Sequence, residues 1–337
     1  MNAAMLQVNV ATEDERNAYA SLNVSSVEPI MVLEIGELLT RNFPVKDPLL
    51  SPWLRRQDLV MIHAKRGVGK THFALGLAYA VAGGGKFLKW TAEEPRRVLY
   101  IDGEMPGAAI KERLAAIVAA NDEKAEPAEG FFRIITPDAQ SAALPDLSTA
   151  SGQDAFDAVI GDAELIVIDN LSTLTRTGVE NEGESWLPVA SWALRMRREG
   201  RAVIFVHHSG KSGVQRGTSR REDILDVVLQ LRQPGDYNPE QGARFEIVFE
   251  KARGVFGNDV ETIEATLTCA QNGNTVWSHR DAAGANIKRV KELKDLGMSN
   301  AEIAVELSVH RSTVYRMIKA AGETSGLVGG ENGGGTA

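Results

Sequence analysis

The sequence has little cysteine and no long apolar run. Its single cysteine is Cys269, so no internal disulfide can form, and this usage fits a reducing compartment. No apolar run approaches the roughly 18 residues that a membrane-spanning helix needs. Residues 1–6 also lack the basic start and the long apolar core of a signal peptide. We therefore expect a cytoplasmic protein with no membrane contact.

The chain also lacks an excess of positive charge. It has 37 lysine and arginine residues against 45 aspartate and glutamate residues, which gives a formal net charge of −8. The chain as a whole is therefore not built to bind nucleic acid, and any such contact must come from local basic patches. With 337 residues, 43% of them hydrophobic, it is long enough for one large globular domain and a small one.

A phosphate-binding loop is the clearest motif that the sequence does contain. An apolar run over residues 59–62 predicts a buried strand, and an apolar helix begins near Lys70. Between them, glycines let the backbone curl so that successive N–H groups point at phosphate oxygens, and the helix N-terminus adds its positive end. A strand-to-helix turn without a ligand is the structural alternative. The predicted nucleotide-binding residues are Ala64, Lys65, Arg66, Gly67, Val68, Gly69, Lys70, Thr71 and His72.

Two side chains of this loop have specific expected roles. Lys70 is expected to reach the β- and γ-phosphates of a nucleotide, and the hydroxyl of Thr71 is expected to ligate Mg²⁺. The loop departs from the usual motif at Ala64, a small residue in place of the first glycine.

Two predicted strands deliver carboxylates to the edge of the sheet where ligands bind. Residues 98–101 lead into Asp102 and Glu104, and residues 165–168 lead into Asp169. We assign Glu104 as the catalytic base that activates the water attacking the γ-phosphate. Asp102 is the alternative base, and a helix-capping role for Glu104 is the structural alternative. Asp169 is expected to hold the hydration shell of Mg²⁺ opposite the threonine of the loop.

A further buried strand is predicted over residues 202–206, and it ends in two histidines. Adjacent residues on a strand point to opposite faces, and no cysteine or histidine cluster lies nearby, so a metal site is disfavoured. A polar sensor of the γ-phosphate fits this position better, and we assign that role to His207. In the preceding helix, residues 186–199, the expected core positions are Trp192, Leu194 and Met196.

Residues 209–221 form a basic, glycine-rich segment without an acidic residue. Such a segment is too rich in glycine for a helix, and its charges fit contacts with DNA or RNA phosphates. A solvated surface loop is the alternative. The predicted phosphate-contacting residues are Lys211, Arg216, Arg220 and Arg221.

Five apolar strands with acids or polar residues at their ends resemble a RecA-like P-loop NTPase core, an α/β fold with a mainly parallel sheet flanked by helices. A glutamate after the strand that follows the phosphate-loop helix is similar to the RecA and DnaB group and unlike AAA+ proteins. More closely, five motifs within roughly residues 50–280 resemble the plasmid RepA-type hexameric helicases. These motifs are Gly-Val-Gly-Lys-Thr-His (67–72), Ile-Asp-Gly-Glu-Met-Pro (101–106), His-His-Ser-Gly-Lys (207–211), Arg-Gly-Thr-Ser-Arg-Arg-Glu-Asp (216–223) and Lys-Ala-Arg-Gly (251–254).

The resemblance implies a homohexameric ring with ATP bound between neighbouring subunits. In such rings a Lys-x-Arg element of one subunit reaches the nucleotide of the next, and Lys251 and Arg253 match this element. A surface charge pair is the alternative. The channel loops would be residues 171–184, which are acidic here, and residues 209–221. The sequence does not decide between a closed ring and a filament.

A small all-α domain is predicted over residues 286–320, where seven basic and four acidic residues give a net charge of +3. Ser299 and Glu302 form a predicted capping box, and the pattern around them resembles the helix-turn-helix of resolvases. A three-helix protein-docking module is the alternative. The resemblance implies that the major groove is contacted by Arg311, Ser312, Thr313 and Arg316. The other expected regions are a flexible arm (1–28), the ATPase domain (29–281) and a disordered glycine-rich tail (321–337). Within the ATPase domain, the sequence also predicts helices over residues 30–39, 108–119 and 154–161 and a closing hairpin of residues 262–268 with residues 274–278. Trp53 is expected in the core, and covering a sheet edge or a nucleotide base is the alternative.

With this resemblance, the sequence predicts a Mg²⁺-dependent ATP hydrolase acting on DNA. The expected form is a ring-forming, replicative-helicase-like motor of a plasmid, phage or integrated mobile element. Its expected partners are single-stranded DNA at the core loops, duplex DNA at the helix-turn-helix, and further copies of the chain. Two alternatives stay open: an ATP-switched filament or loader that does not unwind DNA, and a nucleotide-regulated transcription or partition regulator.

Overall fold

The computed structural model describes residues 30–120, 126–176, 186–209, 223–269, 275–307, 311–312, 314–315 and 317–318. The chain divides into two units, residues 1–44 and residues 45–337. The expected N-terminal arm and glycine-rich tail lie outside the described residues. So do six of the predicted DNA-contacting residues, namely Lys211, Arg216, Arg220, Arg221, Thr313 and Arg316.

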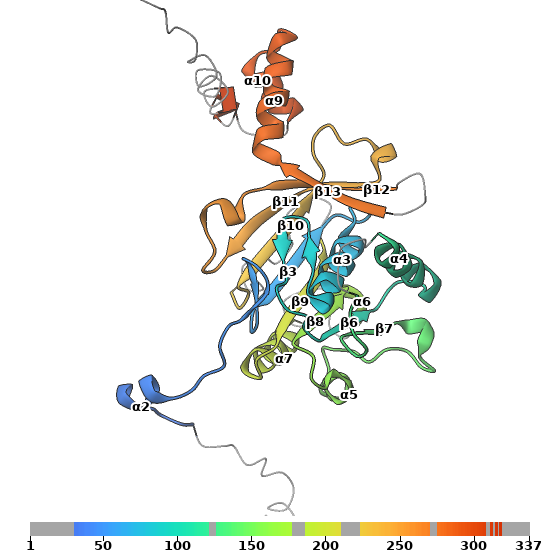
Figure 1. The fold of residues 1–337 in the computed structure, drawn as a ribbon, viewed down its shortest axis with the longest axis vertical. Helices are drawn as coiled ribbons and strands as arrows, with labels where there is room; N and C mark the ends of the chain where they lie inside the picture. The colour runs from blue at the N-terminus through green and yellow to red at the C-terminus, as the bar shows by residue number, and fades with distance from the viewer. Residues whose placement is uncertain are drawn as a thin grey trace, which may run out of the picture. The chain divides into compact units, whose positions relative to one another are not determined.

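A nine-stranded sheet forms the centre of the described part of the second unit (Figure 1). Its strand order is β13-β12-β11-β10-β3-β9-β8-β6-β7. The strands from β10 to β7 run parallel, and β11, β12 and β13 extend the sheet in antiparallel fashion, which confirms the predicted hairpin of β12 and β13. Their bounds are β3 (Leu59–Ala64), β6 (Val98–Asp102), β7 (Phe132–Ile135), β8 (Leu165–Asp169), β9 (Ala202–His208), β10 (Val227–Arg232), β11 (Ala243–Ala252), β12 (Ile263–Cys269) and β13 (Thr275–Asp281).

Helices cover both faces of the parallel strands, as uninterrupted apolar strands predict. Residues of each strand alternate between two cores. Val60 belongs to the core that contains α3 (Lys70–Gly83), and Met61 belongs to the core that contains α5 (Ala150–Ile160) and α7 (Trp186–Arg198). The fold is therefore an α/β fold with a mainly parallel sheet flanked by helices, as the sequence predicts.

The core of α7 differs from the prediction at one position. Trp192 and Met196 are buried, but Leu194 is 41% exposed. Residues four apart lie on the same face of a helix, whereas a residue midway between them points away from it. Leu194 was therefore wrongly expected in the core.

Two helix boundaries also differ from the prediction. Helix α5 begins at Ala150, earlier than the predicted residue 154, because Thr149 caps it by accepting the N–H of Gly152 at 3.0 Å. The start of the predicted loop 171–184 is instead a short helix, α6 (Leu171–Leu174), and the rest of that segment beyond residue 176 lies outside the described residues. Helix α4 (Gly107–Ala119) lies close to its predicted position.

Two small hairpins add to the second unit. They are β1 (Pro48–Leu50) with β2 (Leu54–Arg55), and β4 (Lys86–Phe87) with β5 (Trp90–Thr91). Trp53 is fully buried, as its predicted core role requires, and its ring centroid lies 5.4 Å from that of Trp90. The remaining short turns are η1 (Pro137–Ala139), η2 (Pro239–Gln241) and η3 (Gly257–Val260).

The C-terminal helices share a small core of their own. Helix α9 (Ala282–Asp295) begins directly after β13, before the predicted start of this region at residue 286. Helix α10 (Asn300–Glu306) begins at the predicted capping box, in which Ser299 accepts the N–H of Glu302 at 3.3 Å. The buried core consists of Val290, Leu293, Ile303, Ala304 and Val314. A further helical segment includes residues 311, 312, 314, 315, 317 and 318.

The first unit contains one described helix, α2 (Ile35–Thr40), which begins later than the predicted helix over residues 30–39. None of its residues is buried. Across the described ranges, none of the helices combines the length and the apolar composition that crossing a membrane would require.

Candidate active site

The phosphate loop lies at the carboxyl edge of the parallel strands, between β3 and α3. Gly67 and Gly69 have φ angles of 79° and 118°, a conformation that favours glycine and turns the backbone into the helix. A Cβ on Gly69 would lie 3.0 Å from the ring of Phe245, so β11 packs against the loop. A cavity of about 460 Å³ opens here. It is lined by Gly67, Gly69, Lys70, Thr71, His72, Asp102, Glu104, Met105, Pro106, Arg113, Asp169, Asn170, His208 and Ala243.

Lys70 is buried within this loop. Its ammonium group donates hydrogen bonds to the carbonyl oxygens of Ala64 at 3.1 Å and Lys65 at 3.0 Å. Burial lowers the pKa of Lys70 to about 8, while the carboxylates of Asp169 and Glu104 act in the opposite direction. A buried cation of this kind is stabilised by an incoming anion. The arrangement therefore suits phosphate oxygens, as the sequence predicts.

Asp169 ends β8 as a buried carboxylate. The hydroxyl of Tyr100 donates to Asp169 Oδ2 at 2.6 Å, and Thr71 is a second hydrogen-bond partner. Burial raises the pKa of Asp169, whereas these hydrogen bonds and the charge of Lys70 oppose the rise. A carboxylate beside a hydroxyl is a donor pair that suits Mg²⁺ in phosphate sites, where phosphate and water supply the other ligands. Thr71 and Asp169 therefore fit a magnesium ion.

Glu104 lines the cavity just beyond the end of β6. Its Oε2 accepts a hydrogen bond from Asn170 Nδ2 and lies 3.5 Å from His208 Nε2. The side chain is 56% exposed, so water reaches it. Helix α4 has Pro106 at its N-cap and no side-chain cap. The geometry therefore favours Glu104 as a base over a helix-capping role.

Asp102, the alternative base, is buried and already engaged. Its Oδ1 accepts the backbone N–H of Glu104 at 3.3 Å and of Met105 at 3.2 Å, and its Oδ2 accepts the hydroxyl of Thr136 at 3.4 Å. Burial raises the pKa of Asp102, and these hydrogen bonds oppose the rise. Asp102 therefore shapes the turn that presents Glu104.

The structure corrects the choice between the two histidines of β9. His208 lines the cavity, and its Nε2 lies 3.2 Å from Asn170 Nδ2. His207 is in phase with Phe205, whose side chain packs on the opposite face of the sheet from α3. His208 is in phase with Val206, on the face of α3. Burial and the charge of Lys70 lower the pKa of His208, which favours the neutral ring, while Glu104 acts in the opposite direction.

Sequence reasoning missed two members of this site. Tyr100 lies two residues before Asp102 on β6, so the two side chains point to the same face of the strand. This alternation could have indicated Tyr100 from the sequence. Asn170 follows Asp169 directly, but its importance comes from its contacts with Glu104 and His208. Those contacts depend on which strands are neighbours, so no local pattern indicates them.

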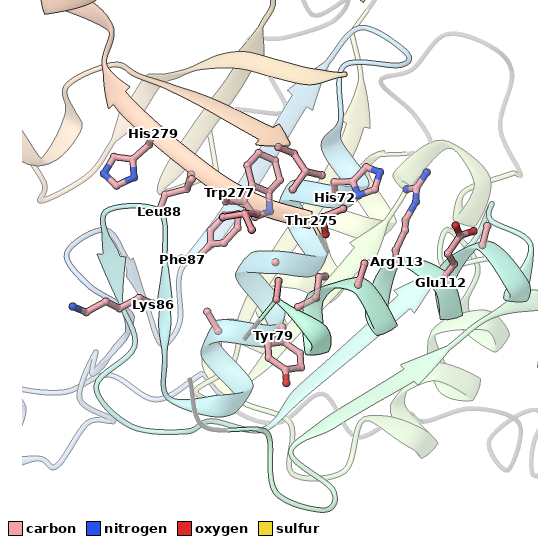
Figure 2. A pocket seen from close by; sticks show the side chains of 18 residues that line it. His72, Tyr79, Lys86, Phe87, Leu88, Glu112, Arg113, Thr275, Trp277 and His279 are labelled. Carbon is pink, nitrogen blue, oxygen red and sulfur yellow. The ribbon is translucent and has the colours of Figure 1, made fainter. Parts of the chain in front are cut away.

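A second, mostly apolar cavity of about 510 Å³ adjoins the first, since His72 and Arg113 line both. Figure 2 shows His72 and Arg113 near one end of it, with Phe87 and Trp277 toward the other. Burial and the charge of Arg113 lower the pKa of His72 to about 4, so this ring is neutral. The cavity lies between α3, α4, the β4–β5 hairpin and β13, and an apolar space beside a phosphate loop suits a flat, aromatic group.

Lys251 and Arg253 lie away from this cavity. Strand β11 runs antiparallel to β10, so Ala252 pairs with Val227, which in turn pairs with Val60 near the start of β3. The phosphate loop follows the other end of β3. Arg253 is exposed and donates to the carbonyl oxygen of Asp223 at 3.2 Å. Within one chain, these two residues are therefore not brought to the predicted site.

Of the residues predicted to contact the major groove, the described ones are Arg311 and Ser312. Both are helical and exposed. Their position leaves them accessible to a partner but identifies none.

The family described as "AAA domain" matches residues 26–214, more than half of the chain. The chain belongs to this AAA domain family. Together with the parallel sheet and the phosphate loop, the match identifies a RecA-like P-loop ATPase. Glu104 follows β6 and not β8, the position that the sequence predicts for it.

A solved structure similar to this chain is that of a KaiC-like protein from the hyperthermophilic archaeon Pyrococcus horikoshii OT3. The two are 16% identical with a TM-score of 0.47, over 69% of this chain and 93% of the other.

Proposed function

We propose that this ATPase is Mg²⁺-dependent, acts on DNA in the cytoplasm, and works as a ring-forming motor resembling the replicative helicases of plasmids, phages or integrated mobile elements. One observation carries the catalytic part of the proposal. A single cavity at the carboxyl edge of the sheet holds the phosphate loop, Asp169, and Glu104 with its partners Asn170 and His208. Phosphoryl transfer to water requires these three parts, namely a phosphate-binding loop, an acid that binds the metal ion, and a catalytic base.

Each residue has a role that follows from its surroundings. Glu104 accepts a proton from the attacking water, whose oxygen bonds to the γ-phosphorus as the bond to ADP breaks. Lys70 would neutralise phosphate charge, and His208, which lies beside the base, would contact the γ-phosphate. Thr71 and Asp169 would hold Mg²⁺, which supplies positive charge to the β- and γ-phosphate oxygens.

The adjoining apolar cavity supports a nucleoside site. The phosphate chain would pass between His72 and Arg113, the two residues common to both cavities. The base would then lie among the apolar and aromatic side chains beyond them, of which Phe87 and Trp277 are examples.

The positions of Lys251 and Arg253 support a site shared between copies of the chain. They lie near the amino ends of the parallel strands, whereas the phosphate loop of the same chain lies at the carboxyl ends. In a head-to-tail assembly, the two edges of neighbouring copies face each other. Arg253 of one copy would then stabilise the charge that develops on the phosphate bound by the next.

The DNA-directed part of the proposal is supported by the basic segment 209–221 and by the net positive charge of residues 286–320. The helical core formed around Val290 and Ile303 fits a small independent module. The same module would also serve a transcription or partition regulator, and an ATP-switched loader would use the same site. Strand separation driven by ATP distinguishes the motor from both.

The direct test compares the wild type with Glu104→Gln. Steady-state ATP hydrolysis should require Mg²⁺, and the variant should lose at least about 100-fold in kcat because the base is gone. Its affinity for ATP should stay close to that of the wild type, because no phosphate contact changes. Glu129→Gln, which alters an exposed carboxylate outside the cavity, is the matched control. A Glu104→Gln variant as active as the control would refute the proposed mechanism.

A further inference from the structure

Asn170 joins the proposed base to helix α6. Its Nδ2 donates to Glu104 Oε2 and lies 3.2 Å from His208 Nε2. Its Oδ1 accepts the N–H of Thr173 at 3.2 Å and so caps α6. Both ends of this one amide are therefore occupied, one by the catalytic cavity and the other by the first turn of the helix.

A steric contact joins the same two elements. A Cβ on Gly103 would lie 2.5 Å from Thr173 Oγ1 and 2.8 Å from Leu174 Cγ, so α6 approaches the backbone here as closely as glycine permits. The N–H of Gly103 also donates to the carbonyl oxygen of Asp169 at 2.7 Å. The residue directly before Glu104 is thus fixed between α6 and the end of β8.

The restraint matters because Glu104 is largely exposed and its other side-chain contact, with His208 Nε2, is long at 3.5 Å. Its side chain is 56% exposed, whereas Asn170 is only 2% exposed. A long, exposed side chain samples several rotamers unless a fixed partner selects one. A buried amide, held in place by its own bond to α6, is such a partner.

We propose that Asn170 is a positioning residue that fixes the orientation of Glu104 and makes it depend on the position of α6. The inference rests on the proposed role of Glu104 as the base. Because α6 holds the other end of the amide, a shift of α6 moves the donor away from Glu104.

The test uses Asn170→Ser in the full-length chain. Serine keeps an oxygen that can cap α6, but its side chain is too short to reach Glu104. We expect kcat for ATP to fall by about tenfold or more, since misorienting a reacting group costs rate. KM and the affinity for a non-hydrolysable ATP analogue should be unchanged. Ser172→Ala, an exposed position on the same helix, is the matched control and should keep the wild-type kcat.

A double-mutant comparison separates positioning from a general structural role. In the background of Glu104→Gln, adding Asn170→Ser should change kcat no further, because the group that it positions is already gone. An equal fold-loss in both backgrounds would overturn the inference, and so would a wild-type kcat for Asn170→Ser.

The two proposals fail in different ways. A fully active Glu104→Gln variant would refute the role of Glu104 and, with it, this inference. An inactive Glu104→Gln variant together with a fully active Asn170→Ser variant would refute this inference alone.

Discussion

At the scale of single residues, the cavity holds charges that burial disfavours. Burial lowers the pKa of Lys70 to about 8 and raises that of Asp169. Their hydrogen bonds and their mutual attraction offset this cost only in part, and each gains a further opposite charge when an anionic nucleotide and a metal ion bind. The chemistry of these residues therefore favours a metal–phosphate complex as the ligand.

The lowered pKa of Lys70 gives a pH dependence with a defined sign. The amine loses its proton as pH rises through 8, and phosphate binds the protonated form. ATP affinity should therefore be constant below pH 8 and should weaken above it, by at most about tenfold per pH unit for one linked proton. Titration with a fluorescent ATP analogue between pH 7 and 9.5 measures this.

The matched variant for this effect is Lys70→Arg. Arginine stays protonated throughout this range, so its affinity, even if lower overall, should lose the step above pH 8. A step of the same size in this variant would show that another group is responsible.

The two histidines of β9 should differ in their effect on catalysis. His208→Ala should lower kcat by about tenfold to 100-fold, because it removes a polar partner of Glu104 that is also the proposed contact of the γ-phosphate. His207→Ala should leave kcat near that of the wild type, whatever its effect on stability, because its side chain belongs to the other face of the sheet. Steady-state kinetics of both variants tests this, and the reverse order would contradict the assignment.

The site residues that a local sequence motif defines could be predicted. Lys70 and Thr71 follow from the loop motif, and Asp169 follows from an apolar strand that ends in an acid. The phase of the strand, and not the order of the residues, decides which histidine faces α3, so His208 lines the cavity in place of the predicted His207. Asn170 could not be found, because its partners come from neighbouring strands.

At the scale of elements, close packing of α6 on the turn before Glu104 gives a further prediction. Gly103→Ala should push α6 and this turn apart, since the added Cβ would overlap Thr173 and Leu174. We expect kcat to fall by about tenfold or more while nucleotide affinity is retained, because the base moves and the phosphate loop does not. Kinetics and analogue binding on the same preparation measure both quantities.

The matched control for this prediction is Gly130→Ala. Gly130 has no heavy atom within 4 Å of an added Cβ, although its φ of 80° makes alanine strained there. The control should therefore lose some stability but keep its kcat. Equal kcat values for the two variants would contradict the steric account.

Elements were predictable in proportion to their length and periodicity. The apolar strands and α3 follow directly from their sequences. The two-residue strands β4 and β5 carry too short a pattern to be seen, and α6 has only four residues. Helix α6 exists because Asn170 caps it and because Leu171 and Leu174 are buried, which are tertiary contacts.

At the scale of the whole molecule, the proposed mechanism requires Arg253, an arginine that the cavity of a single chain does not receive from that chain. The phosphate loop follows the carboxyl end of β3, and Arg253 follows the end of β11 that pairs toward the start of β3. A copy bound head-to-tail would supply the missing arginine. Assembly could not be predicted from composition, because it depends on which residues lie at each end of the parallel strands.

The measurement that tests this account most directly is steady-state ATP hydrolysis by the wild type and Arg253→Ala, with and without single-stranded DNA. Arg198→Ala, an exposed arginine of α7, is the matched control. The account predicts that DNA stimulates the wild type and the control. It also predicts that Arg253→Ala binds nucleotide but loses about 1,000-fold in kcat, as the loss of a transition-state arginine does. An Arg253→Ala variant with wild-type kcat, and no response to DNA, would contradict both the shared site and the motor.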